Sequence, residues 1–405
     1  MKHFIPRITV IVSALLAIIG YVPGFEAAEQ NEEVTYEVQP LSSLGGTNSR
    51  GNGVNDAGLV TGFSNLTGNM ARRASVWFHD QVFQLDPLGG TNSSVAWSGK
   101  NNSGLVVGIT QTSQLQTRTD GWSCRAFFPG PDNTKYTCVG FVWEGGRMTA
   151  LPTLGGANGF ATSANSQRQV VGWAETTVPD TTCTDPSQPG FSAVLWDLNR
   201  QMTMPLPPYP NDSAGAATAI SDRGHVVGIS GDCDQSVGRR TARHAVLWKN
   251  GTVKDLGNLG ADTWNTPTAI TKDGDIIVGF ANAPGADPDE PSFRAWLWTE
   301  RDDIACSKLP GTHICDLGTL EPGGTAEAWG VNDRGQVVGT SCSPTGDCRA
   351  FVWENGEMKD LDLLKGAYPQ RLFNAMDINN LGQITGRART SAGFEAFIAS
   401  PKLPK

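Results

Sequence analysis

The stretch VNDRGQVVG, residues 331–339, recurs along the chain and decides its fold. The six other copies are VNDAGLVTG (54–62), KNNSGLVVG (100–108), ANSQRQVVG (164–172), ISDRGHVVG (220–228), ITKDGDIIVG (270–279) and INNLGQITG (378–386). Asn or Asp near Gly favours a tight turn, because Asx side chains bond the nearby backbone and Gly tolerates a positive φ. The β-branched run after the turn favours a strand. Each signature therefore predicts two strands joined by a turn.

A second element, ending in Trp, follows each signature after a connection of variable length. Its copies are ASVW (74–77), GFVW (140–143), AVLW (193–196), AVLW (245–248), AWLW (295–298) and AFVW (350–353), while the seventh, AFIA (396–399), lacks the Trp. This pattern is typical of a strand that is buried on both faces. We interpret the repeated Trp as a core residue, with a ligand platform as the alternative. A hairpin turn and a fourth strand that runs into Leu-Gly-Gly or a relative complete a unit of four strands.

The spacing and the chain ends predict how these units assemble. Equivalent turn positions (58, 104, 168, 224, 274, 335 and 382) are 46 to 64 residues apart, close to the length of a four-stranded propeller blade. The last unit stops near residue 400 without a fourth strand, whereas residues 35–46 form a fourth strand without a preceding unit. We therefore predict an all-β fold, a single seven-bladed β-propeller over residues 35–400, closed by pairing the N-terminal strand with the last blade. A solenoid is the alternative, but it would expose two end units.

The N-terminal residues and the overall charge bear on the compartment. Residues 1–28 resemble an export signal, with Lys2 and Arg7 before a short apolar run; an uncleaved anchor is the alternative. The 405 residues carry a net charge of −9, which becomes −10 without residues 1–28 (29 basic, 39 acidic). We expect an extracellular or periplasmic monomer with no further membrane span and no nucleic-acid partner, because an acidic surface repels phosphate.

The eight cysteines of an exported chain suggest disulfides. Their placement around short loops and after neighbouring signatures predicts four pairs: Cys124 with Cys138, Cys183 with Cys233, Cys306 with Cys315, and Cys342 with Cys348. A metal site is the alternative, but no CxxC occurs and the chain has only five histidines. We predict no metal site and no cofactor.

The combined motifs resemble a known family, the bacterial extracellular repeats named for His-Ala-Phe, or HAF repeats. The resemblance rests on Leu-Gly-Gly, Asn-x-x-Gly-x-Val-Val-Gly, Ala-Phe-x-Trp and Met-x-Asp-Leu, and it covers roughly residues 41–399. His precedes Ala only at His244, so that His is not a shared group in this chain. The resemblance implies export and a propeller-like fold, and it implies no defined reaction.

Candidate binding residues lie in the connections between second and third strands, which carry most of the length variation. These connections fall within residues 109–139, 173–191, 229–244, 280–294 and 340–349. Variable loops on a rigid scaffold commonly build binding sites. Their aromatic residues, together with one near the start of the fifth unit, are the predicted ligand-binding residues: Trp122, Phe127, Tyr136, Trp173, Trp264 and Phe293. The alternative is that these rings pack the loops onto the scaffold.

The sequence gives little indication of a calcium site or of a catalytic motif. The signatures lack the alternating carboxylates and distal Glu of a calcium loop, and Asp287, Asp289 and Glu290 are most simply solvated carboxylates. No Gly-x-Ser-x-Gly, HExxH or phosphate-binding glycine loop occurs, so we predict no catalytic residue. His225 and His244 are the histidines at strand-end or rim positions.

Three functions therefore stay open. The first is a non-catalytic binding propeller for a glycan, peptide or protein. The second is a hydrolase or lyase acting at the channel mouth, with scattered residues that leave no local motif. The third is a structural surface or matrix protein.

The cysteine pairing makes a direct prediction. Thiol titration of the denatured, unreduced protein should detect no free thiol, because all eight cysteines are paired. One or more free thiols per chain would contradict the pairing.

Overall fold

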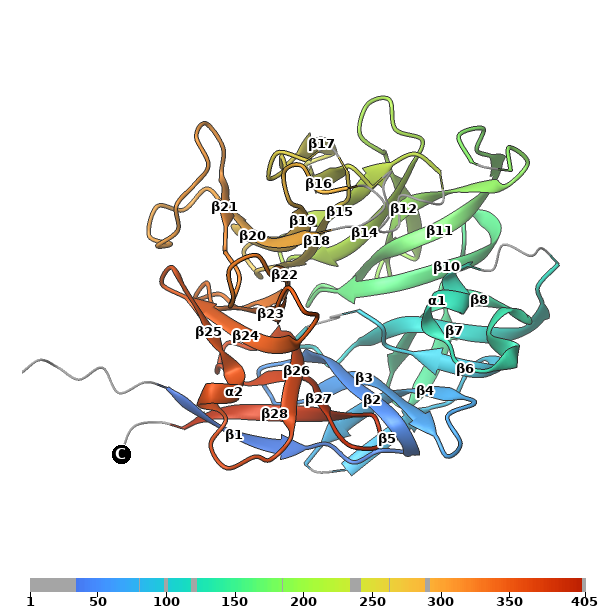
Figure 1. Cartoon of the computed structure of the whole chain (residues 1–405). Coiled ribbons are helices and arrows are strands. Elements are labelled where there is room, and N and C mark those ends of the chain that lie inside the picture. Colours follow the sequence, from blue (N-terminus) through green and yellow to red (C-terminus); the bar gives the residue numbers. More distant parts are fainter. Residues whose placement is uncertain are drawn as a thin grey trace, which may run out of the picture. The chain divides into compact units, whose positions relative to one another are not determined.

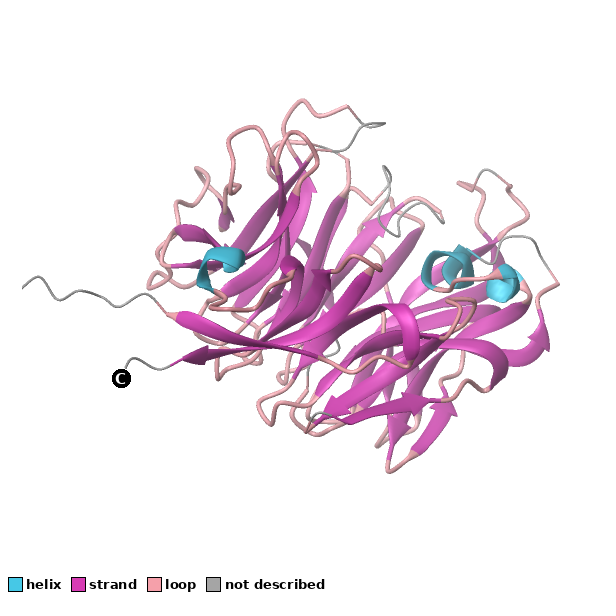
Figure 2. Ribbon diagram, turned by 60° about the horizontal axis from the view of Figure 1, so that its bottom comes forward, coloured by secondary structure: helices cyan, strands magenta, loops and turns pink. Residues whose placement is uncertain are grey.

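The computed structural model describes residues 34–79, 81–97, 101–117, 122–183, 185–233, 242–261, 263–287 and 292–402. The predicted export signal, residues 1–28, lies outside these ranges. The described part is all-β, with 28 strands, two short α-helices and one 3₁₀ turn (Figure 2). The helical segments are α1 (Trp122–Phe127), η1 (Pro131–Thr134) and α2 (Leu361–Leu364). The all-β prediction is therefore confirmed.

Five antiparallel sheets each contain four strands that are consecutive in the chain. The first contains β6 (Gly89–Ser94), β7 (Val106–Leu115), β8 (Tyr136–Glu144) and β9 (Arg147–Ala150). The second contains β10 (Gly155–Ala164), β11 (Gln169–Pro179), β12 (Pro189–Asp197) and β13 (Met202–Leu206). The third contains β14 (Ala214–Ile220), β15 (Val226–Gly231), β16 (His244–Lys249) and β17 (Thr252–Asp255). The fourth contains β18 (Asn265–Ile270), β19 (Ile276–Asn282), β20 (Phe293–Thr299) and β21 (Ile314–Asp316). The fifth contains β22 (Thr325–Val331), β23 (Val337–Cys342), β24 (Cys348–Glu354) and β25 (Glu357–Asp360).

The remaining eight strands form one sheet that joins the two ends of the described chain. The first repeat unit supplies β2 (Gly45–Val54), β3 (Val60–Leu66), β4 (Arg72–Phe78) and β5 (Gln81–Leu85). The last supplies β26 (Arg371–Ile378), β27 (Ile384–Arg389) and β28 (Phe394–Lys402). Strand β1 (Thr35–Pro40) pairs antiparallel with β28, from Thr35 opposite Lys402 to Pro40 opposite Phe397, and Figure 1 shows the two side by side. The N-terminal strand is thus the fourth strand of the last unit, as the sequence predicts.

The signature Asn explains why the turn repeats. In the last copy, the Asn379 Oδ1 accepts hydrogen bonds from the backbone N–H groups of Leu381 (3.0 Å) and Gln383 (2.8 Å). Its Nδ2 donates to the carbonyl of Asn55 in the first unit, at 2.8 Å. One buried amide therefore shapes its own turn and bonds the neighbouring unit. The Oδ1 atoms of Asn55, Asn101, Asn165 and Asn332 accept the same pair of turn bonds.

The residue after the signature Asn continues these contacts from one unit to the next. The Asn380 backbone N–H donates to Asp56 (2.9 Å), and the Asp56 N–H donates to the Asn102 Oδ1 (2.9 Å). Further bonds run from Asp333 to Asn380, from Lys272 to Asp333, from Asp222 to Lys272 and from Ser166 to Asp222. We call the seven residues Asp56, Asn102, Ser166, Asp222, Lys272, Asp333 and Asn380 the turn belt. The belt links all seven signature turns through six contacts.

The closing glycine of the signature allows the first two strands of a unit to approach closely. A Cβ at Gly172 would lie 1.9 Å from the Phe160 carbonyl oxygen, and one at Gly386 would lie 2.0 Å from the Asn374 oxygen. At the equivalent Gly62, Gly108, Gly228, Gly279 and Gly339, a Cβ would likewise lie 2.0 to 2.3 Å from a first-strand carbonyl oxygen. Any larger residue would therefore separate the two strands.

The apolar core lies between neighbouring units. One cluster combines Val338 and Val352 of the sixth unit with Leu372 and Ile384 of the seventh. Five of the six repeated Trp side chains are buried (Trp77, Trp196, Trp248, Trp298 and Trp353), which confirms their interpretation as core residues. The indole N–H of Trp248 donates to the Pro207 carbonyl at 2.7 Å, so it also bonds the segment that follows the preceding unit.

Substitution of the inter-unit amide should destabilise the fold. Asn379→Ala removes two turn bonds and the bond to Asn55 at a fully buried position, so we expect a loss of about 1–3 kcal/mol of unfolding free energy. Denaturant unfolding would measure it. Gln81→Ala, at an exposed position of β5, is the control and should change stability by less than about 0.5 kcal/mol. Equal effects of the two substitutions would contradict this role of Asn379.

Candidate functional site

The connections between second and third strands are longest in the second to fifth units, as predicted. They join β7 to β8, β11 to β12, β15 to β16 and β19 to β20. The four disulfides link the predicted cysteine pairs. Cys183–Cys233 joins two of these connections to each other, and Cys124–Cys138 ties α1 to β8. We call this side of the domain, opposite the signature turns, the loop-rich end.

Most of the predicted ligand-binding aromatics pack onto the scaffold. The half-buried ring of Phe127 lies 4.8 Å from the buried ring of Phe160. Tyr136 is half-buried at the start of β8, with the Lys135 Nζ 5.2 Å from its ring centre. The side chain of Trp122 lies outside the described residues, as do Asp289 and Glu290.

Trp173 is a core residue in this structure rather than the ligand-facing ring that the sequence suggested. It is 1% exposed, and its ring lies 5.5 Å from that of Phe191. It directly follows the closing glycine of its signature, and this position points into the space between neighbouring units. The loop that we assigned to Trp173 begins only after β11 ends at Pro179.

Trp264 and Phe293 belong to a continuous aromatic cluster that spans three units. Their ring centres are 4.9 Å apart, and Phe293 lies 5.0 Å from Phe280. Phe280 contacts Trp329 on β22 at 5.4 Å, and Trp329 contacts Trp97 at 5.7 Å. The Trp97 indole N–H donates to the Thr268 carbonyl of β18 at 3.2 Å. A tryptophan of the second unit therefore reaches the fifth and sixth units, which are distant in the sequence.

Three arginines form a second cluster, which involves the first and last units. Arg50 lies on β2, Arg72 on β4 and Arg387 on β27. The guanidinium carbons of Arg72 and Arg50 lie 3.7 and 5.3 Å from the ring centre of Phe63. We call Arg50, Arg72 and Arg387 the arginine cluster. Arg72 also donates to the Phe127 carbonyl at 2.7 Å, which places the cluster beside the loop-rich end.

Sequence reasoning missed the arginine cluster, although one signal was present. The residue after the closing glycine is, in chain order, Phe63, Ile109, Trp173, Ile229, Phe280, Thr340 and Arg387. Five of the seven are apolar, because this position packs against the next unit. A guanidinium at Arg387 breaks that pattern, and a comparison of the seven copies position by position would have revealed it.

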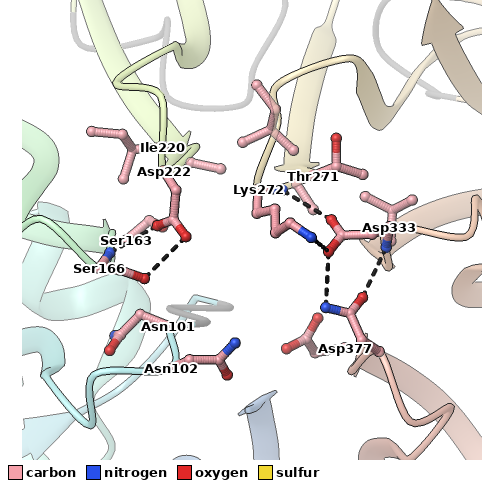
Figure 3. Close-up of a pocket in the computed structure, with 15 residues that line it drawn as sticks. Asn101, Asn102, Ser163, Ser166, Ile220, Asp222, Thr271, Lys272, Asp333 and Asp377 are labelled. Atoms are coloured by element: carbon pink, nitrogen blue, oxygen red, sulfur yellow. Dashed lines mark hydrogen bonds and ion pairs between the residues drawn. The ribbon is translucent and has the colours of Figure 1, made fainter. Parts of the chain in front are cut away.

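A small polar pocket lies among the signature turns (Figure 3). It has a volume of about 60 Å³, room for only a few water molecules, and six of the seven turn-belt residues line it. Its carboxylates are already engaged: Asp222 accepts from the Ser166 N–H and hydroxyl, and Asp333 accepts from Lys272 and Asn380. The pocket is therefore the centre of a structural network.

Asp212 and His244 form a close histidine–carboxylate pair. The His244 Nδ1 lies 2.8 Å from the Asp212 Oδ2, and the Ser230 hydroxyl donates to the same oxygen at 2.7 Å. In a hydrolytic triad the serine bonds the histidine instead. His225, the other candidate, is half-buried beside Gly274, and burial lowers its pKa.

The part of the chain that the structure describes holds one group of potential metal ligands and no helix suited to crossing a membrane. The group comprises Asp180, Cys183 and Cys233, and its two sulfurs form a disulfide. No helix in the described ranges has the length and apolar character needed to cross a bilayer.

Comparisons with known family models and with curated protein sequences find no match. Among solved structures, the β-propeller domain of the Trilobed protease from Pyrococcus furiosus aligns with a TM-score of 0.48 and 11% identity, over 91% of this chain and 95% of that one. TolB from Acinetobacter baumannii aligns with a TM-score of 0.38 and 10% identity, over 84% of this chain and 63% of that one. Pyrococcus horikoshii acylaminoacyl peptidase aligns with a TM-score of 0.46 and 10% identity, over 90% of this chain and 54% of that one. Similarity at this level does not extend to an activity.

The half-buried residue Glu327 yields a pH prediction. Glu327 lies on β22, two residues before Trp329, and burial raises its pKa above the ordinary value. The neutral carboxyl is favoured in the folded state, so its stabilising effect is complete below about pH 4.5 and is lost as pH rises through the folded-state pKa. Glu327→Gln stays neutral, and should therefore melt at a higher temperature than the wild type at pH 7.5. The difference should disappear at pH 4.

Thermal melts at the two pH values would measure this effect. Glu37→Gln, at an exposed position on β1, is the matched control and should follow the wild type at both. A Glu327→Gln variant that melts below the wild type at pH 7.5 would show that the carboxylate makes a stabilising contact.

Proposed function

We propose that residues 35–400 form a closed, seven-bladed β-propeller in which each blade is one repeat unit and β1 completes the last blade. The bond from Asn380 to Asp56, at 2.9 Å, supports closure because it joins the seventh signature to the first. Asn102 and Ser166, the two ends of the turn belt, line the same small pocket, which also supports a closed arrangement. The family that we propose for the repeats is the HAF family.

The protein acts, in this proposal, as a non-catalytic binding module for a glycan, peptide or protein. The contrast between the two ends of the repeat units carries the proposal. At the signature turns, the polar side chains bond one another. Beside the loop-rich end, three arginines have no ion pair with any described carboxylate, and aromatic rings remain half-buried. Arginine and aromatic side chains at a rigid site are common anchors for ligands.

We propose an extracellular or periplasmic location for this binding module. The four disulfides support it, because such bonds persist mainly in oxidising compartments. Loops that are tied to each other lose little conformational entropy when a ligand binds, which favours affinity.

A combined glycan and peptide array would test the binding function. The mature protein should bind a restricted set of ligands. Phe127→Ala truncates a half-buried ring of the loop-rich end and should weaken binding by about fivefold or more, because an interface anchor is lost. Leu381→Ala, at an exposed position of the seventh signature turn, is the control and should bind as the wild type does.

Other results of the array would point to other functions. Loss of binding in Leu381→Ala, but not in Phe127→Ala, would move the site to the signature turns. Cleavage of an arrayed glycan, detected by mass spectrometry, would make the protein a hydrolase or lyase. Binding to no arrayed ligand would favour a structural role.

A further inference from the structure

The arginine cluster is held by aromatic rings instead of by acidic groups. The guanidinium of Arg387 lies 4.3 Å from the ring centre of Phe394 and 4.9 Å from that of Phe373. These two rings are themselves 5.0 Å apart. Stacking on aromatic faces positions a guanidinium without neutralising it. The positive charges of the cluster therefore remain available.

The hydrogen-bond donors of the cluster are only partly used within the described chain. Arg50 donates once, from Nη2 to the Ala96 carbonyl at 3.2 Å, and its buried Nε has no partner. The guanidinium of Arg387 makes no hydrogen bond or ion pair with a described residue, and its Nε is buried. An unpaired buried donor is costly unless something bonds it. A ligand that accepts several hydrogen bonds would satisfy these groups.

Other arginines of the same chain show how different this arrangement is. Arg349 contacts the carboxylates of Glu321, Asp347 and Asp360. Arg371, on β26 of the same unit as Arg387, contacts Asp347 and Asp362. The chain has 40 acidic and 31 basic residues, so acidic partners are abundant. Among the described residues, the lack of acidic partners around the arginine cluster is therefore a local feature.

The mutual repulsion of the three guanidinium groups supports the idea that the cluster binds a negatively charged ligand. Burial, together with the nearby charge of Arg387, lowers the pKa of Arg50 to about 9 and that of Arg72 to about 10. An anion in contact with the three groups would oppose both effects.

A cleft of about 380 Å³ shares Phe394 with the surroundings of the arginine cluster, although none of the three arginines lines it. Phe394, which stacks on Arg387, is one of its walls. Hydroxyl groups line it from both the first and the last unit, namely those of Ser42, Ser43, Thr47, Ser49 and Thr390. Its carboxylate, Glu395, accepts a hydrogen bond from the Tyr368 hydroxyl at 2.6 Å. An aromatic wall and several hydroxyls suit a sugar ring.

We propose that the arginine cluster binds the carboxylate of an acidic sugar, whose ring packs beside Phe394 at the edge of the cleft. The planar guanidinium fork matches the two oxygens of a carboxylate, and such charge-assisted bonds are stronger than neutral ones. The proposal rests on the binding function proposed above and names its ligand class. It also explains why an arginine replaces the apolar residue at position 387.

Calorimetry at constant ionic strength, with D-glucuronate, D-glucose and N-acetylglycine as probes, would test this site. The wild type should bind glucuronate and not glucose, and it should bind N-acetylglycine more weakly than glucuronate. Arg387→Met introduces an apolar residue of similar length, and most other units have an apolar residue at this position. It should lower the affinity for glucuronate by about tenfold or more, because a charge-assisted hydrogen bond is lost. Its unliganded melting temperature should equal or exceed that of the wild type, so that lost binding cannot be attributed to unfolding.

The control and the contrary outcomes are defined in the same assay. Arg389→Met, at the exposed end of β27, removes an equal charge and should bind glucuronate as the wild type does. If Arg387→Met bound glucuronate as tightly as the wild type does, the arginine cluster would not be the binding site. If the wild type bound N-acetylglycine more tightly than glucuronate, the ligand would not be an acidic sugar. Array binding that persists unchanged in Arg387→Met would overturn this inference and leave the binding function intact. Conversely, Arg387-dependent binding of a uronate polymer that is then cleaved would overturn only the non-catalytic function.

Discussion

The side-chain amide of the signature asparagine is the contact on which the rest of the structure depends. Its oxygen shapes the turn, while its nitrogen can bond the next unit, as Asn379 bonds Asn55 and Asn332 bonds Asn379. In the copies with Ser221 and Thr271, the hydroxyl oxygen keeps a turn bond, and the hydroxyl of Thr271 donates within its own turn instead of to a neighbouring unit. The turn belt adds side-chain and backbone contacts between all seven copies. Local turn chemistry and long-range assembly therefore use the same residues, which explains why the signature recurs.

Because the polar groups of the signature turns bond one another, the two ends of the repeat units have different roles. At the signature turns, carboxylates and amides are hydrogen-bonded to one another, and the pocket between them is small. At the opposite end, the closing glycine brings the first two strands together and directs the following residue between units. Six of these residues are apolar or Thr, and the seventh is Arg387. A charge in an apolar layer is unfavourable by itself, so its presence beside Arg50 and Arg72 is the strongest sign of a function other than packing.

The sequence predicted much of the fold and little of the site. Repetition identified the four strands of each unit, the pairing of the N-terminal strand with the last unit and the four disulfides, because these follow from local patterns and from the order of units. The aromatic prediction was less successful. Trp173 lies in a segment that looked like a loop, but β11 extends to Pro179 and the ring of Trp173 is buried. Residues that bury a ring and residues that present one have the same identity in a sequence, so exposure could not be inferred.

By itself, the sequence determined the repeat unit, its turn and the contact between the two chain ends, since each depends on residues that are close in the chain or on their regular spacing. Only the tertiary structure brought Arg50 and Arg72 of the first unit beside Arg387 of the last, and Trp97 beside Trp329. These groupings join residues hundreds of positions apart, and no spacing rule relates them. Which side chains meet across two units depends on how strands pack and twist in three dimensions, and the charge left unpaired by that packing is visible only there.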